Sequence, residues 1–119
     1  MPRTRKPKGP KRIAYELIAP ATPVGRPIYI LQRDLVRDFH PELAEARFAI
    51  AWNTSWRPDV DGRVPLAKIR KATDLDRELA AFDFIILLRK AFWNDRGITD
   101  LQRQAVMDHE LAHAAVRCD

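Results

Sequence analysis

Residues 109–113, His-Glu-Leu-Ala-His, have the types and spacing best suited to bind a metal ion, and they lie close to the end of the 119-residue chain. On an α-helix, residues four apart differ by about 40° in direction, so the imidazoles of His109 and His113 can reach one ion. Glu110 is turned by about 100° from His109, so it flanks that ion without binding it. This H-E-x-x-H spacing is typical of helical zinc sites.

We therefore predict that His109 and His113 bind Zn²⁺. We expect Glu110 to be the catalytic base, which takes a proton from a zinc-bound water and passes it to a leaving amine. In a chain with three histidines and five glutamates, this motif should arise by chance only about 0.003 times, which favours a real site. Ala105, Val106, Ala112 and Val116 share the histidine side of the helix, so we expect an apolar layer around the two rings.

A zinc site of this kind needs a third protein ligand, and the residues leave several candidates open. Asp119 is six positions after His113, where metzincins (H-E-x-x-H-x-x-G-x-x-H) place theirs, although Val116 replaces their glycine. Cys118, an acid within residues 74–83, or a ligand from outside this chain are the alternatives. We expect His40, beside Pro41, to act at a helix C-terminus instead of at the metal.

The periodicity of apolar residues predicts the elements that position this motif. Residues 99–117 contain no proline or glycine and begin with Thr99 and Gln102 in capping-box spacing, so they are predicted to form a long helix. Residues 82–88 are the most apolar stretch and are predicted to form the central strand. The remaining predictions are a strand at 13–18, a connector at 19–27, a helix at 28–39, a helical turn at 42–46, a strand at 47–52, a hairpin loop at 53–63, a strand at 64–70, a short helix from residue 73 and a turn of helix at 90–94.

This order of elements predicts an α+β domain with a small, mostly antiparallel sheet. Pro65 cannot donate a ladder hydrogen bond, so the 64–70 strand is expected at a sheet edge. Trp52 alternates with Phe48 and Ile50 and is assigned to the core, whereas Trp56, in the polar loop, is expected to be partly exposed.

The positive net charge of +5 is concentrated at the N-terminus. Residues 1–12 hold six basic and no acidic residues, and the remainder has 15 basic against 16 acidic residues. We interpret residues 1–12 as a disordered basic tail, capable of a weak contact with nucleic acid, and residues 13–119 as one domain. The chain has one cysteine, no apolar run of membrane-spanning length and no secretory signal, so we expect a cytoplasmic location and no membrane partner.

Three segments together resemble the family of phage-encoded putative metallopeptidases: ARFAIAW, GRVPLAKIRKATDLDRELAAFDFIILL and LQRQAVMDHELAHAAV. The resemblance implies a minimal zincin-like fold, with a small sheet packed against a C-terminal active-site helix. It also implies zinc on His109 and His113, Glu110 as base, a peptide or protein substrate, and the host cytoplasm as location. Members of this family continue beyond the motif, so we expect the domain to be truncated at its C-terminus.

Two functions from different classes follow from these patterns. The first is a zinc-dependent metallopeptidase that hydrolyses peptide bonds through Glu110 and a zinc-bound water. The second is a catalytically inactive, zinc-stabilised interaction module, whose basic arm contacts nucleic acid or a partner. In zincins, substrates commonly add to a sheet edge as an extended strand, which makes the 64–70 strand the candidate substrate-binding edge.

Overall fold

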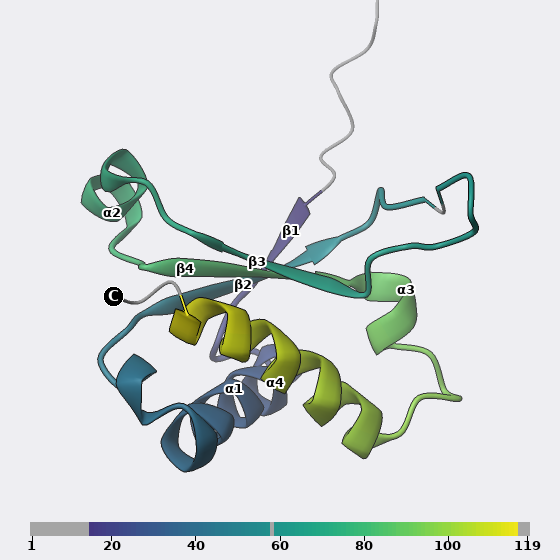
Figure 1. The fold of residues 1–119 in the computed structure, drawn as a ribbon, viewed down its shortest axis with the longest axis horizontal. Coiled ribbons are helices and arrows are strands. Elements are labelled where there is room, and N and C mark those ends of the chain that lie inside the picture. Colours follow the sequence, from purple (N-terminus) through teal and green to yellow (C-terminus); the bar gives the residue numbers. More distant parts are fainter. Residues whose placement is uncertain (1–14, 58, 117–119) are drawn as a thin grey trace, which may run out of the picture.

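The computed structural model describes residues 15–57 and 59–116 and shows one sheet with helices packed against it (Figure 1). The elements, in chain order, are β1 (Tyr15–Ile18), α1 (Gly25–Phe39), the 3₁₀ turn η1 (Pro41–Leu43), β2 (Phe48–Asn53), β3 (Ala67–Lys71), α2 (Asp74–Ala80), β4 (Phe84–Arg89), α3 (Lys90–Trp93) and α4 (Asp100–Val116). This confirms the α+β class and the predicted elements, with shifts of a few residues at their ends. Within the described ranges, none of the helices combines the length and apolar character needed to cross a bilayer.

The four strands form a mixed sheet in the order β1-β2-β4-β3. β1 pairs with β2 and β3 pairs with β4 in antiparallel fashion, whereas β2 and β4 are parallel. The predicted hairpin across residues 53–63 is therefore wrong, because β4 lies between the two strands that the loop connects. β4 is apolar on both faces and suits an inner position, whereas β3, with Lys68, Arg70 and Lys71, suits an edge.

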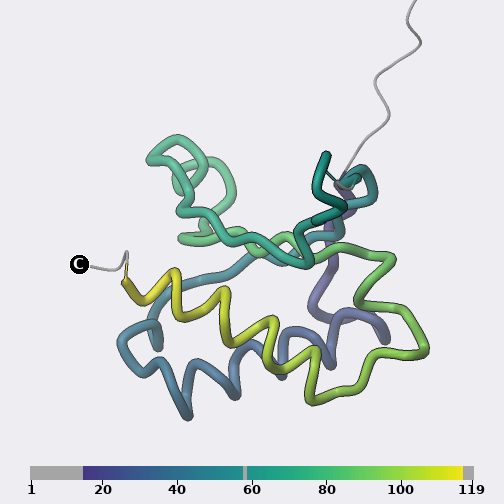
Figure 2. Tube along the Cα trace, turned by 45° about the vertical axis from the view of Figure 1, so that its right-hand side comes forward, coloured from purple at the N-terminus to yellow at the C-terminus, as the bar shows by residue number. Residues whose placement is uncertain are grey.

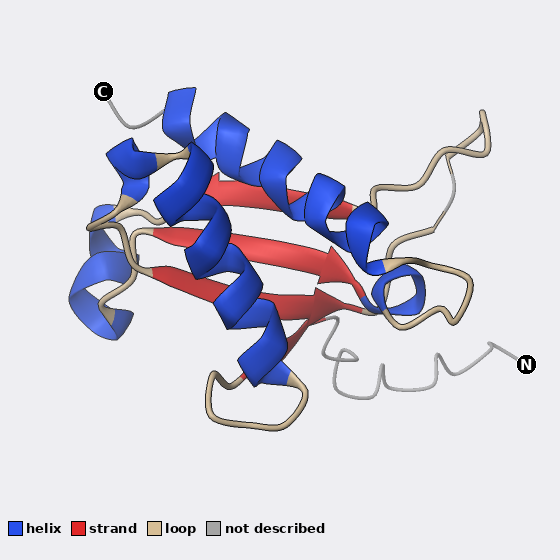
Figure 3. Ribbon diagram, turned by 90° about the horizontal axis from the view of Figure 1, so that it is seen from below, coloured by secondary structure: helices blue, strands red, loops and turns tan. Residues whose placement is uncertain are grey.

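Helices α1 and α4 lie on the same face of the sheet, as the view from below shows (Figure 3). The core between these layers is apolar and includes the central pair Ile50 and Ile86 and the helix residues Met107 and Leu111, all fully buried. Trp52 is 6% exposed, as predicted for a core residue. Phe39, at the last turn of α1, lies outside this core and is 62% exposed.

The hydroxyl of Tyr29 ties helix α1 to two strands. It donates a hydrogen bond to the carbonyl oxygen of Ile18 at 2.8 Å and accepts one from the amide of Ile50 at 3.0 Å. Burial raises the pKa of this phenol above its ordinary value, and the hydrogen bond from Ile50 partly opposes that change. One polar side chain thus fixes the distance between helix and sheet without leaving a buried group unsatisfied.

Candidate metal centre

Helix α4, which carries the H-E-x-x-H motif, is fixed at its beginning by side-chain hydrogen bonds. The amide of Gln102 donates to the Thr99 hydroxyl at 3.1 Å, and the amide of Thr99 donates to the Gln102 side chain at 2.8 Å, which confirms the capping box. The Arg103 guanidinium donates to the carbonyl oxygen of Trp93 at 2.8 Å. These bonds set where the helix starts, and hence where residues 109–113 lie along it.

The buried side of α4 consists of Met107, Glu110, Leu111 and Ala114. This face packs the helix against β3, α1 and η1, and the tube view shows α4 running alongside those segments (Figure 2). Since buried residues recur every three to four positions, one side of the helix is fixed in the core and the other faces solvent.

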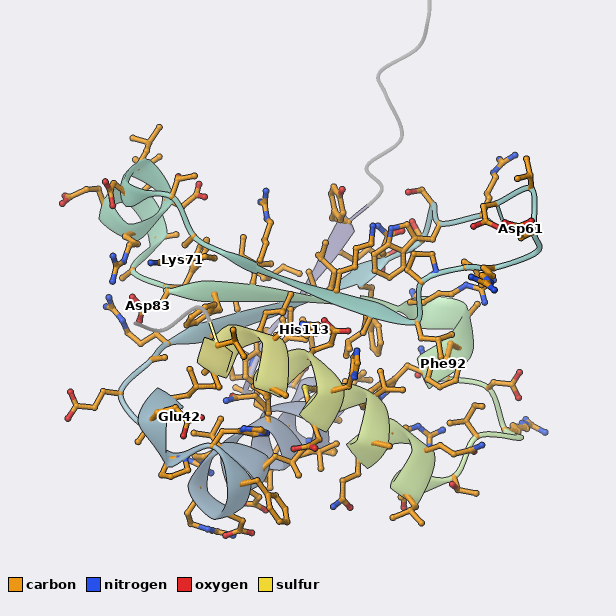
Figure 4. The ribbon with its side chains drawn as sticks, viewed as in Figure 1. Glu42, Asp61, Lys71, Asp83, Phe92 and His113 are labelled. Carbon is orange, nitrogen blue, oxygen red and sulfur yellow. The ribbon has the colours of Figure 1, made fainter. Side chains whose placement is uncertain are left out.

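His109 and His113 lie on the solvent side, next to this buried stripe. Of the four residues predicted to form an apolar layer around the histidines, Ala105, Ala112 and Val116 are exposed, whereas Val106 packs against the core, so the prediction is confirmed only for Val106. Met107 and Leu111, on the other side of the helix, are the residues of α4 that are fully buried in the core. In the side-chain view, His113 lies at the later turns of α4 (Figure 4).

The two imidazoles are brought together as the spacing predicts. The Nε2 atoms of His109 and His113 are 3.1 Å apart, and the ring planes are nearly perpendicular, at 85°. Two nitrogens bound to one tetrahedral zinc at about 2.0–2.1 Å would be about 3.3–3.4 Å apart. The observed separation therefore differs by a few tenths of an ångström from that of two zinc-bound imidazole nitrogens, and imidazole is a ligand that zinc accepts.

Glu110 lies beside the histidine pair but on the buried side of α4, whereas the histidines are exposed. Its side chain belongs to the buried stripe, and the residue is 8% exposed. Glu110 and His109 together line a cavity of about 360 Å³, whose other walls are Ala105 and Val106 of α4 and Leu66 and Ala67 at the start of β3. Glu110 thus lines a space that it shares with one of the two candidate ligands.

The third ligand is not identified by the structure. Within residues 15–57 and 59–116, no three His, Cys, Asp or Glu side chains lie close enough to hold a metal ion. Asp119, the sequence candidate, and Cys118, its alternative, lie outside the described residues. The pair His109 and His113 is what the described part of the chain offers to a metal.

Two of the four acids between residues 74 and 83, Asp76 and Asp83, are engaged elsewhere. Asp76 completes the capping box of α2, receiving the Thr73 amide at 3.2 Å. Asp83 accepts the Arg47 amide at 2.8 Å and the Arg77 guanidinium at 2.9 and 3.1 Å. In Figure 4, Asp83 lies at the end of the sheet toward α2, so it joins β2, α2 and β4 rather than approaching the histidines.

We expect Asp83→Asn to lower the free energy of unfolding by about 2 kcal/mol at neutral pH, because the hydrogen bonds to a partly buried charge are weakened. The pKa of the Asp83 carboxyl is lowered in the folded protein, chiefly by the Arg47 amide and also by Arg77. Its contribution is therefore complete above the ordinary value of 3.8 and is lost as pH falls through the lower folded value. Denaturant titrations between pH 7 and about pH 2 measure this change.

Asp38→Asn is the matched control for Asp83→Asn. Asp38 also pairs with an arginine, Arg37, but both side chains are exposed on α1. The control should unfold like the unaltered chain, since exposed pairs contribute little. Equal stability of the two variants at neutral pH would contradict the role given to Asp83.

His40 is at the C-terminal end of α1, as predicted. Its amide donates to the carbonyl oxygen of Val36 at 3.0 Å, and its ring contacts Asp108 through Nε2 at 2.7 Å. The ring therefore connects α1 to α4 one residue before the motif, a contact that the sequence analysis missed. Only the packing of α1 against α4 brings these two residues together, so no local pattern could have revealed it.

The comparison with known families shows which family the chain belongs to. A family model described as "Putative phage metallopeptidase" matches residues 27–119. The chain belongs to this family. The match spans α1 to the end of the chain and so includes the sheet edge and all of H-E-x-x-H. No curated protein and no solved structure matches the chain. A metallopeptidase family implies a metal cofactor, and the histidine pair of α4 is suited to hold one.

Proposed function

We propose that the chain is a zinc-dependent peptidase, with His109 and His113 as metal ligands and Glu110 as the base. The observation that carries the proposal is the 3.1 Å separation of the two Nε2 atoms on a helix fixed by its buried stripe. Membership of a metallopeptidase family supports it. A zinc ion held here would supply the Lewis acidity that activates water and polarises a peptide carbonyl.

The residues of the chain supply the remaining steps. The Glu110 carboxylate adjoins the cavity beside His109, where it can accept a proton from the attacking water. The same group can then return the proton to the departing amine nitrogen, which leaves Glu110 ready for another turnover. The two histidines stay in place because α4 is capped at Thr99 and packed through Met107 and Leu111.

The edge strand β3 is the proposed binding site for the substrate. One side of β3 pairs with β4, and the other has no strand partner among the described residues, so its backbone can pair with an extended peptide. Leu66 and Ala67, at the start of β3, share a cavity with His109 and Glu110. A peptide added along this edge would pass beside the catalytic carboxylate.

Cleavage of dye-labelled casein by the zinc-loaded protein tests this proposal. We expect fluorescence to increase with time, to stop after zinc removal by 1,10-phenanthroline and to resume when zinc is restored. Metal content measured in the same samples shows whether the recovery follows rebinding. Cleavage that continues at full rate in zinc-depleted protein would contradict a zinc peptidase, as would no cleavage by the zinc-loaded form.

A further inference from the structure

The second face of the sheet, opposite α1 and α4, carries residues that have no role in the proposed peptidase site. We call it the open face, because no helix of the described part of the chain lies across it (Figure 1). The strand register and the alternation of side chains assign ten residues to it: Tyr15, Leu17, Ala49, Ala51, Asn53, Lys68, Arg70, Ile85, Leu87 and Arg89. Three are cations and none is an acid.

The three cations of the open face lack carboxylate partners. Lys68 and Arg70 are alternate residues of β3, about 6.6–6.8 Å apart along the strand, and Arg89 ends the neighbouring β4. None of them makes an ion pair with another described residue. Some arginines elsewhere in the fold pair with a carboxylate, as Arg77 does with Asp83. The open face therefore presents uncompensated positive charge to solvent.

An aromatic side chain completes this surface. The ammonium group of Lys68 lies 5.8 Å from the centre of the Trp56 ring, which places the indole beside the cations. The side-chain oxygen of Asn53 accepts the amides of Ser55 and Trp56 at 2.8 and 2.9 Å, and so holds the loop that carries the ring.

A cavity of about 340 Å³ adjoins the Trp56 ring, lined by Asn53, Thr54, Trp56, Arg89, Lys90 and Ala91. An aromatic wall and a cationic side chain therefore meet in one recess. Of the three tryptophans, Trp56 is the partly exposed one, since Trp52 and Trp93 are each 6% exposed.

We propose that the open face binds single-stranded nucleic acid, with phosphates on Lys68, Arg70 and Arg89 and a base against Trp56. Uncompensated cations beside an accessible aromatic ring are what single strands require, because the backbone is anionic and every base has a flat face. A duplex keeps its bases stacked inside, and an acidic peptide has no planar group for the Trp56 recess. The proposal does not depend on the peptidase activity.

The salt dependence of binding by the full chain provides the first test. The probes are fluorescently labelled oligothymidylate and oligouridylate, followed by anisotropy at several salt concentrations. Each phosphate contact on a single strand contributes about 0.7 to the slope of log K against log salt. The double variant Lys68→Ala/Arg70→Ala should therefore lower the magnitude of that slope by about 1.4 for whichever oligonucleotide the protein binds.

The matched control is Arg26→Ala/Arg33→Ala, which removes the same charge from exposed positions of α1, on the other side of the sheet. This control should retain the original slope, even though the six basic residues of 1–12 remain in both variants. Equal slopes for the two double variants would overturn the proposal, because binding would then follow net charge and not the open face. Failure of the full chain to bind either oligonucleotide would also overturn it.

Replacement of Trp56 provides the second test. Trp56→Ala should weaken oligonucleotide binding about tenfold, whereas Trp56→Phe, which keeps a ring, should bind within a few-fold of the unaltered chain. If Trp56→Ala lowers the melting temperature, the other variants still test the proposal. Trp56→Phe keeps an aromatic ring, and Lys68→Ala/Arg70→Ala changes only exposed side chains, so neither should disturb the fold. Displacement of the oligonucleotide as effectively by polyglutamate or by duplex DNA would contradict the proposal.

Discussion

Glu110→Gln is expected to abolish peptide-bond cleavage while leaving zinc bound. Glutamine has nearly the shape of glutamate but cannot accept the proton of the attacking water, so the rate should fall by at least about 10²-fold. Metal affinity should persist because Glu110 faces the buried stripe of α4, whereas the histidine pair lies on the exposed side. Casein cleavage and the zinc-to-protein ratio are measured on the same preparation.

Glu45→Gln is the matched control, since it makes the same chemical change at an exposed position after η1. This variant should cleave casein at the unaltered rate and bind the same amount of zinc. Cleavage retained by Glu110→Gln would exclude Glu110 as the base. Loss of zinc from Glu110→Gln would instead assign the carboxylate to the metal itself.

His109→Ala and His113→Ala are each expected to weaken zinc binding by more than about 100-fold. Loss of a residue that only supports a ligand already costs about 10–100-fold, and loss of the ligand itself should cost more. Both rings are exposed, so neither substitution removes packing from the core. Competition against a chromophoric chelator gives the affinities, and melting curves of the zinc-depleted proteins should coincide with that of the unaltered chain.

His40→Ala tests whether zinc binds specifically to His109 and His113 or to any histidine of the chain. The His40 ring contacts Asp108 and joins α1 to α4, so its removal should leave zinc affinity within a few-fold of the original. If all three histidine variants lose zinc equally, the pair on α4 is not the defined site. If neither α4 variant loses affinity, the metal is held elsewhere.

The elements governed by local pattern were predictable from the sequence. The Thr99 and Gln102 capping box fixed the beginning of α4 correctly, because it depends on residues three apart. The inner position of β4 followed from its apolar faces, and the edge position of β3 followed from Pro65 and its charged residues. The approach of His109 to His113 followed from helix geometry alone.

The features that depend on distant parts of the chain were not predictable. Two strands joined by a turn-rich loop suggested a hairpin, but the pairing of β2 with β4 is set by a later segment. The side of α4 that is buried depends on where the sheet lies, so Ala105, Ala112 and Val116, which are exposed, were wrongly predicted to form an apolar layer beside the histidines. The role of Asp83 depends on Arg47 and Arg77 together, which no spacing rule relates.

X-ray absorption at the zinc edge of the full chain, loaded with one equivalent of zinc, tests the central claim most directly. The geometry of α4 predicts two imidazole nitrogens in the first shell at about 2.0–2.1 Å, and the loss of one of them in either His109→Ala or His113→Ala. A shell that contains fewer than two imidazoles, or that stays unchanged in both variants, would contradict the claim that these two histidines hold one metal ion.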